Sequence, residues 1–234
     1  MPAAPARRSG PLVVIVPALN EAANLPRTLA AVPRGAVTDL RVVVVDDGST
    51  DGTSEVARSH GADVVARHER NRGLGAALRT GLSIARDLDC RAAVYVDADG
   101  EYDPAGIPAL VEPIERDGFD YVLGSRYRGS RVNQRLSRNL ANRPFTVALS
   151  VAAGRRITDG QTGFRAFSRR AVDAAEIIHD YNYAQVLTLD LSRKRMRMAE
   201  VPVCWRPREH GTSFIRAEYL WRVPAGIVRQ LLRA

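Results

Sequence analysis

The first half of the sequence is built from short apolar runs that each end abruptly in a polar turn, and few folds accept this pattern. The runs lie at residues 12–16, 41–45, 64–66, 92–96 and 121–124. Unbroken apolar runs of this length are typical of strands buried on both faces, as in a parallel sheet covered by helices. Segments of helix length separate them, which suits right-handed βαβ crossovers. We therefore predict an α/β fold with a Rossmann-like, mostly parallel sheet flanked by helices.

Further elements are predicted between these strands and in the second half of the chain. The expected helices cover residues 22–32, from 54 onward, 71–87, 104–115, 145–153 and 180–190. A glycine-rich turn at 159–167 should lead into another strand, and the apolar run at 198–205 is typical of a late strand. Because Pro202 has no N–H to donate to a ladder, that strand is expected at a sheet edge.

The chain is expected to form one folded domain over residues 11–215. Residues 1–10 contain Pro, Ala and Arg without an apolar core, which predicts a disordered leader and not a signal peptide. Residues 216–234 mix aromatic, aliphatic and arginine side chains, so we expect an amphipathic helix that lies on an anionic membrane surface or packs on the domain. The longest apolar stretches, 12–19 and 145–153, are shorter than the roughly 20 residues of a membrane span.

Polar side chains follow three of the predicted strands directly. They are Asn20 and Glu21, Asp46 and Asp47, and Asp97 and Asp99. Because parallel strands share one carboxyl edge, where ligands bind in open α/β sheets, these residues are expected to converge. One acidic turn alone is usually a solvated loop. Two of them beside an Asn-Glu pair favour a crevice for a nucleotide and a metal ion.

The turn at Asp97-Ala98-Asp99 is the strongest candidate for metal binding. Gly100 lets the backbone turn sharply, and Glu101 supplies a third carboxylate. Close carboxylates repel one another unless a cation lies among them, and hard oxygen ligands suit Mg²⁺ or Mn²⁺ that carries a substrate's phosphates. The sequence therefore predicts a divalent metal site at Asp97, Asp99 and Glu101.

The positive charge of the chain comes almost entirely from arginine. The formal net charge is +8, and Lys194 is the single lysine. Nucleic acid, an anionic membrane or a phosphorylated substrate could each account for the charge, but no helix-turn-helix, zinc finger or aromatic-basic platform accompanies it, so no nucleic-acid partner is expected. Five arginines lie close together at Arg128, Arg131, Arg135, Arg138 and Arg143. They form either a solvated basic face or a phosphate-binding patch.

The Gly73-x-Gly75 turn and the two cysteines each allow two interpretations. The Gly73-x-Gly75 turn opens a helix as a phosphate loop would, but it lacks the third glycine of a dinucleotide fingerprint, so a structural turn is favoured. Cys90 and Cys204 lie in or beside apolar runs, which favours two unpaired core thiols in a reducing, cytoplasmic compartment over a disulfide.

Taken in order, five motifs resemble those of the family 2 glycosyltransferases of the GT-A fold. They are VVIVPALNE at 13–21, VDDGSTDGT at 45–53, DAD at 97–99, GSRY at 124–127 and TGFR at 162–165. More narrowly, the chain looks like the dolichol-phosphate mannosyltransferase and polyprenyl-phosphate glycosyltransferase branch, over residues 12–213. The Gln-x-x-Arg-Trp motif of processive synthases is absent, which argues against a polymerase.

The resemblance implies roles for individual residues. The donor nucleotide would be held by Pro17, Ala18, Asn20, Glu21, Asp46, Asp47, Asp97 and Ala98. Asp97 and Asp99 would serve ribose and metal, with Glu101 where the family commonly has Gln. Arg126, with Arg135 or Arg138, would grip an acceptor phosphate. Asp97, Asp99, Arg126 and Arg138 would then form the catalytic set.

The implied reaction is an inverting, metal-dependent transfer of a hexose from a GDP- or UDP-sugar to polyprenyl phosphate, in the cytoplasm or at the cytoplasmic face of a membrane. An alternative is the same catalysis on a soluble hydroxyl acceptor. That acceptor would need a general base, for which His179, Asp180 and Asp190 are candidates. A second alternative is a non-catalytic scaffold that binds a nucleotide sugar.

Overall fold

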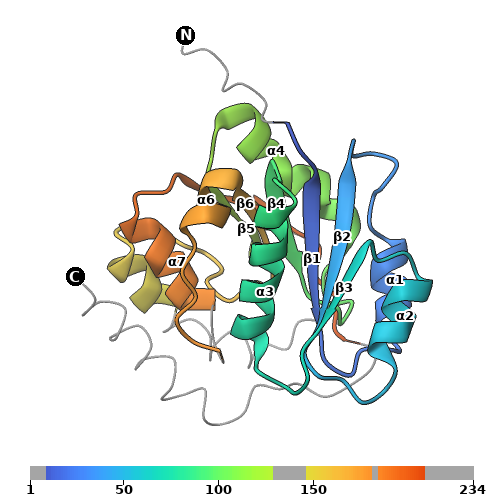
Figure 1. Cartoon of the computed structure of the whole chain (residues 1–234). Helices are drawn as coiled ribbons and strands as arrows, with labels where there is room; N and C mark the ends of the chain where they lie inside the picture. The colour runs from blue at the N-terminus through green and yellow to red at the C-terminus, as the bar shows by residue number, and fades with distance from the viewer. Residues whose placement is uncertain (1–8, 129–145, 181–183, 209–234) are drawn as a thin grey trace.

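The computed structural model describes residues 9–128, 146–180 and 184–208. They form one seven-stranded sheet with helices on both faces (Figure 1). The strands are β1 (Leu12–Ala18), β2 (Leu40–Asp46), β3 (Val64–Arg67), β4 (Ala92–Val96), β5 (Tyr121–Ser125), β6 (Phe164–Ser168) and β7 (Met198–Pro202). The helices include α1 (Leu25–Ala30), α2 (Thr53–Ser59), α3 (Leu74–Asp87), the 3₁₀ turn η1 (Pro104–Gly106), α4 (Ile107–Asp117), α6 (Arg169–Ala174) and α7 (Ala184–Arg193). A further helix covers 146–152.

The strand order is β3-β2-β1-β4-β6-β5-β7. β1 to β4 pair in parallel, and β5 pairs in parallel with β7. β6 lies antiparallel between β4 and β5, so β5 keeps the direction of the first four strands. The predicted α/β fold with a mostly parallel sheet is confirmed, and β7 occupies an edge as Pro202 indicated. The inverted orientation of β6 was not anticipated.

β1 runs two residues further than its apolar run, because it includes Pro17 and Ala18. β1 pairs with β4 only as far as Ile15, whereas its pairing with β2 continues to Ala18. Beyond Ile15 the strand therefore has a partner on one side only, and a proline is tolerated at such a position. The strand therefore continues two residues beyond the apolar run at 12–16 that predicted it.

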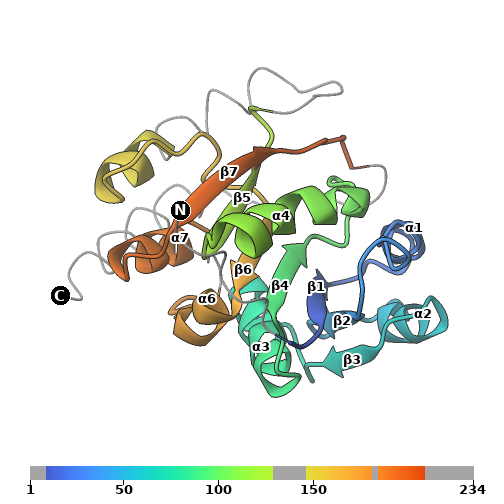
Figure 2. The same cartoon turned by 90° about the horizontal axis from the view of Figure 1, so that it is seen from above.

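Alternate residues of the buried strands pack into two cores, one on each face of the sheet. Helices cover both faces (Figure 2). Val13 and Ile15 of β1 belong to the core that α3, α6 and α7 cover. Val14 and Val16 belong to the core that α1, α2 and α4 cover. This alternation follows from the two-residue period of a strand. Both faces of the central strands are thus buried, which explains their continuous apolar sequence.

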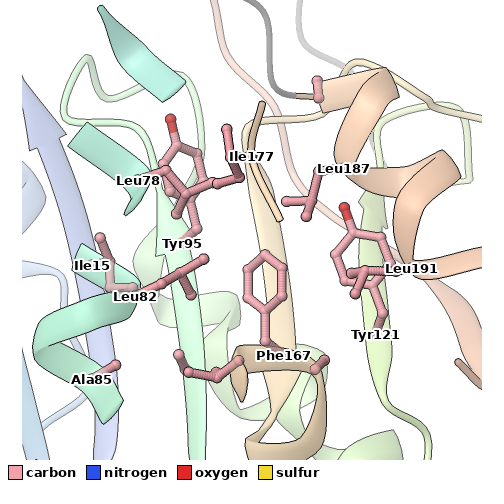
Figure 3. Close-up of a cluster of buried hydrophobic side chains, with 14 of the residues drawn as sticks. Ile15, Leu78, Leu82, Ala85, Tyr95, Tyr121, Phe167, Ile177, Leu187 and Leu191 are labelled. Carbon is pink, nitrogen blue, oxygen red and sulfur yellow. The ribbon is translucent and has the colours of Figure 1, made fainter. Parts of the chain in front are cut away.

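The core under α3 and α7 is filled by aromatic and aliphatic side chains from helices and strands (Figure 3). Phe167 and Tyr95 are fully buried there beside Leu82 and Leu187. Each side chain of this size contributes about 1.5–3 kcal/mol when it leaves water. α3 lies very close to β1, because a Cβ on Gly81 would lie 2.3 Å from Ile15 Cγ2. The absence of a side chain at residue 81 therefore allows α3 to pack directly on β1.

The two cysteines differ in exposure. Cys90 is 1% exposed, and burial raises the pKa of its thiol to about 11. Cys204 likewise forms no disulfide but lies on the surface, so the prediction of two core thiols was wrong for Cys204. Since the thiolate is the reactive form, a disulfide reagent at pH 8 is expected to label Cys204 rapidly and Cys90 only on unfolding. Mass spectrometry of the labelled peptides checks this, and fast labelling of Cys90 would contradict it.

Candidate active site

The turn after β4 carries Asp97 and Asp99 in fixed positions. Gly100 has a φ of 72°, a left-handed conformation that glycine adopts without strain. Asp99 Oδ1 accepts a hydrogen bond of 2.9 Å from the Glu101 backbone N–H, which closes the turn. Tyr95 Oη donates to Asp97 Oδ1 at 2.8 Å. Both carboxylates are therefore placed at the carboxyl edge of the sheet.

Asp97 is covered by the turn that precedes β6. A Cβ placed on Gly163 would lie 1.7 Å from Asp97 Oδ2, so only glycine lets these two turns meet. Burial raises the pKa of the Asp97 carboxyl well above its usual range, and the charges of Asp99 and Glu101 raise it further. The hydrogen bond from Tyr95 acts in the opposite direction. A carboxylate in these surroundings is stabilised strongly by a nearby cation.

The guanidinium of Arg208 joins the ends of β1 and β4. Arg208 Nη2 donates to Asp99 Oδ2, and Arg208 Nη1 lies 3.9 Å from Glu21 Oε1. The side chains of Glu21 and Asp99 are only 8% and 7% exposed. Burial raises the pKa of Glu21, while a hydrogen bond from Asn24 and the charge of Arg208 oppose that rise. The loops after β1 and β4 therefore meet, as their shared edge predicted.

The loop after β1 is also bound to the loop after β2. The Asn20 N–H donates to Ser49 Oγ at 2.9 Å, and Asn20 Oδ1 accepts from the Thr50 N–H at 2.9 Å. The Glu21 N–H donates to Thr53 Oγ1 at 3.0 Å. Three loops that are distant in sequence thus form one continuous edge.

Asp46 and Asp47 are buried, and their oxygens bind neighbouring loop atoms. Asp46 accepts from the Ser49 N–H and from Ser54 Oγ. Burial alone would raise the pKa of Asp46, but these hydrogen bonds outweigh it and lower the pKa. Asp47 accepts from the backbone N–H groups of residues 72 and 73 and pairs with the ring of residue 68. Both carboxylates shape the loops, and their predicted contact with a donor nucleoside stays a prediction.

The other predicted donor-binding residues lie on the same edge. Pro17 and Ala18 end β1, and Ala98 lies between the two aspartates of the β4 turn. Thr28 Oγ1 of α1 donates to the Ala98 carbonyl at 2.9 Å, so this hydrogen bond attaches the β4 turn to α1. The structure therefore groups these residues, while their contact with a donor remains predicted.

Arg126, predicted to grip an acceptor phosphate, has a carboxylate partner. Its Nε donates to Asp159 Oδ2 at 2.7 Å and its Nη2 donates to Asp159 Oδ1 at 2.8 Å. The two residues therefore form a bidentate ion pair. Asp159 is itself bound, through its backbone N–H, to Glu200 Oε1. A phosphate role for Arg126 therefore stays a prediction. The other predicted acceptor residues, Arg135 and Arg138, lie outside the described residues.

The Gly73-x-Gly75 turn is a close contact with another segment. A Cβ on Gly75 would lie 2.0 Å from the His179 carbonyl oxygen, and the Gly75 N–H donates to the Asp180 carbonyl at 2.7 Å. These backbone atoms lie over the N-terminus of α3, where a phosphate would have to bind. The favoured interpretation as a structural turn is therefore supported.

Of the three side chains weighed as general bases, Asp180 and Asp190 form ion pairs. Asp180 pairs with Arg79. Asp190 on α7 pairs with Lys194 and accepts from the Glu176 N–H at 3.1 Å. These two carboxylates thus hold elements together beside α3 and α7.

The carboxylates of the β4 turn fit a divalent cation only in part. Among the described residues, no group of three or more His, Cys, Asp and Glu side chains is arranged to hold a metal ion. Glu101 Oε2 accepts from the Trp205 indole N–H at 3.1 Å, so this carboxylate is directed toward Trp205. Asp97 and Asp99 remain as hard oxygen donors beside a bound guanidinium. This set fits Mg²⁺ or Mn²⁺ that takes further ligands from a diphosphate.

Sequence reasoning missed Arg208 and the partner role of Asp159. Arg208 stands in a polar loop that carries no local motif for metal or anion binding. Asp159 lies in the glycine-rich turn that was recognised, but nothing in the spacing links it to Arg126. The predicted helix at 216–234 and residues 1–8 of the predicted leader at 1–10 lie outside the described residues. Within the described ranges, no helix is long and apolar enough to cross a bilayer.

Comparison with known proteins gives consistent matches. The model of the family "Glycosyl transferase family 2" matches residues 13–175. An undecaprenyl-phosphate mannosyltransferase of Micrococcus luteus is 32% identical over 212 residues, covering 86% of each chain. A UDP-N-acetylglucosamine–dolichyl-phosphate N-acetylglucosaminyltransferase of Methanococcus voltae is 28% identical, covering 82% of this chain and 84% of the relative.

A solved structure shares the fold. Glucosyl-3-phosphoglycerate synthase from Mycobacterium tuberculosis, in complex with Mn²⁺, UDP and glucosyl-3-phosphoglycerate, superposes with a TM-score of 0.73 at 24% identity. The match covers 96% of this chain and 79% of that chain. The family model and the Micrococcus luteus relative each match well over half of this chain. The protein is therefore a family 2 glycosyltransferase with the GT-A fold.

Proposed function

We propose that this glycosyltransferase transfers a hexose, with inversion, from a GDP- or UDP-sugar to a polyprenyl phosphate, and that the reaction requires Mg²⁺ or Mn²⁺. Two relatives that match most of the chain are named for transfer to undecaprenyl and dolichyl phosphate, which supports this class of acceptor. Because such an acceptor is embedded in a membrane, the enzyme would work at the cytoplasmic membrane surface.

The observation that carries the proposal is the buried acidic site at the meeting point of β1 and β4. Glu21 and Asp99 share one guanidinium there, and Asp97 lies beside them under Gly163. A divalent ion bound at this site would neutralise the charge that develops on the departing nucleoside diphosphate. Asp97 and Asp99 would hold that ion, and the loops at 17–21 and 46–53 would orient the donor.

A phosphate acceptor suits the side chains around the site. Its oxygen is already anionic at neutral pH, so it can attack the anomeric carbon from the face opposite the diphosphate without losing a proton to the protein. A hydroxyl acceptor would require a general base. Both carboxylates weighed for that role, Asp180 and Asp190, are held in ion pairs with Arg79 and Lys194.

The proposal is tested with a sugar-labelled donor, Mn²⁺ and two acceptor pools, extracted membrane lipid and polar metabolites. We expect labelled product in the organic phase only, and no labelled product besides the unreacted, water-soluble donor when the metal is removed with EDTA. A labelled water-soluble product, separated from the donor, with none in the organic phase would instead identify the soluble-acceptor enzyme. Tight donor binding without transfer to either pool would identify a scaffold. Running GDP- and UDP-sugars separately identifies the donor base.

A further inference from the structure

The segment that follows β7 lies against the candidate metal site. Residues 203–208, here called the strap, leave the edge of the sheet toward the side on which α1 lies (Figure 2). Tyr102 and Trp205 form an antiparallel bridge, and the Arg206 N–H donates to the Glu101 carbonyl at 2.9 Å. The Trp205 indole N–H donates to the Glu101 side chain at 3.1 Å. The strap is therefore bound to the same turn that carries Asp97 and Asp99.

Arg208, at the end of the strap, places its charge among buried carboxylates. Its side chain is 19% exposed, and it contacts Asp99 from the β4 turn and Glu21 from the β1 loop. Glu101 adds a further favourable electrostatic interaction. Carboxylates buried this closely destabilise one another unless a cation compensates them. A guanidinium stays charged at all physiological pH values, so it compensates them without any bound ion.

A divalent ion and the guanidinium require the same carboxylate. Arg208 donates to Asp99 Oδ2, and Asp99 is one of the two residues that would hold the metal. Two cations on one carboxylate would repel each other at close range. The guanidinium and the metal are therefore alternatives, and the entry of one requires the other to move.

We propose that Arg208 is an internal cation that occupies the carboxylate site of the metal-free enzyme and must leave Asp99 when a divalent ion binds. The inference rests on the metal site of the proposed function. Because the strap is bound to the β4 turn through Trp205 and residue 206, metal entry is coupled to a rearrangement of the strap. Arg208 then acts as a positioning residue that sets the metal affinity.

The test measures Mn²⁺ binding to the full chain by electron paramagnetic resonance, without nucleotide or acceptor. Arg208→Gln removes the positive charge that would repel a bound Mn²⁺ at close range. This variant is therefore expected to lower the Kd for Mn²⁺ at least ~10-fold. Arg206→Gln is the matched control, because Arg206 lies on the same strap, is half exposed and faces Asp103 at 3.7 Å. It should bind Mn²⁺ like the wild type.

Thermal unfolding gives a second readout that does not depend on activity. In EDTA, Arg208→Gln should melt below the wild type, because its buried carboxylates have lost their cation. Added Mn²⁺ should raise the melting temperature of Arg208→Gln by more than that of the wild type, since an ion that binds only the folded state stabilises in proportion to its affinity. If Arg208→Gln does not fold, Arg208→Met, which also removes the charge, replaces it and should bind Mn²⁺ more tightly than the wild type.

The outcomes separate this inference from the proposed function. A Kd that is unchanged or weaker in the Arg208 variants, with Mn²⁺ bound by the wild type, overturns the internal-cation role and leaves the metal-dependent transferase standing. Absence of Mn²⁺ binding in the wild type and all variants, even with a nucleoside diphosphate added, overturns both. Tighter binding in the Arg208 variants alone supports the proposal.

Discussion

Replacement of Asp99 by Asn is expected to reduce glycosyl transfer by about 10²- to 10³-fold while the fold persists, because the developing diphosphate charge loses its electrostatic partner. Asn has nearly the same shape, so it fits the same buried position, where Asp99 is 7% exposed. It can still accept the hydrogen bond from the Glu101 N–H, and the turn is preserved. The measurement is kcat/KM with labelled donor, together with circular dichroism and Mn²⁺ affinity.

The control for this variant lies on the same turn. Asp103 also follows β4 and accepts a hydrogen bond from the Ala105 N–H, but its side chain is 36% exposed. Asp103→Asn keeps that hydrogen bond and should retain wild-type turnover. Full activity in Asp99→Asn would remove Asp99 from the metal site, and equal losses in both variants would point to a general effect on the turn.

Gly163→Ala is expected to lower turnover about 10²-fold, because the added methyl group displaces the Asp97 carboxylate. The new Cβ would lie 1.7 Å from Asp97 Oδ2 and 2.6 Å from its Cγ, so the carboxylate must move by more than an ångström. Misplacement of a reacting group by about 1 Å is enough for a loss of that size. Activity and Mn²⁺ affinity should fall together, while circular dichroism reports an intact sheet.

Gly35→Ala provides the comparison for Gly163→Ala. A Cβ on Gly35 meets nothing within 4 Å, so the same chemical change should leave activity and stability at the wild-type values. Wild-type turnover in Gly163→Ala would show that the position of the Asp97 carboxylate does not matter for the reaction. In that case Asp97 would have a structural role, as the acceptor of the hydrogen bond from the Tyr95 hydroxyl.

Much of the site was predictable because its loops follow strands that share one direction. The apolar runs located β1, β2 and β4 to within about two residues, and the polar residues after each run were therefore assigned to one edge. The structure places Glu21 and Asp99 on one guanidinium, in agreement with that assignment. Gly100 was also predicted correctly, since its φ of 72° follows from the sharp turn after the acids.

Two residues have surroundings that the sequence did not indicate, because these depend on segments that are remote in sequence. Arg126 was predicted to face an acceptor phosphate, and in the structure it faces Asp159, 33 residues later. Cys204 was assigned to the core because it lies in the apolar run at 198–205, but the edge strand β7 ends at Pro202 and the thiol lies beyond it on the surface. In each case the local pattern was recognised and the neighbour was not.

The sequence alone determined the strands, the direction they share and the acidic residues at their ends, because the spacing of apolar and polar residues acts within one element. Only the tertiary structure decided that β6 lies inverted between β4 and β5, and that Arg208 meets Asp99 across 109 residues. Such a pairing depends on where a whole strand and its strap are placed by the packing of both cores. No local spacing encodes that placement, and so the cation that compensates the acidic site could be found only in the folded chain.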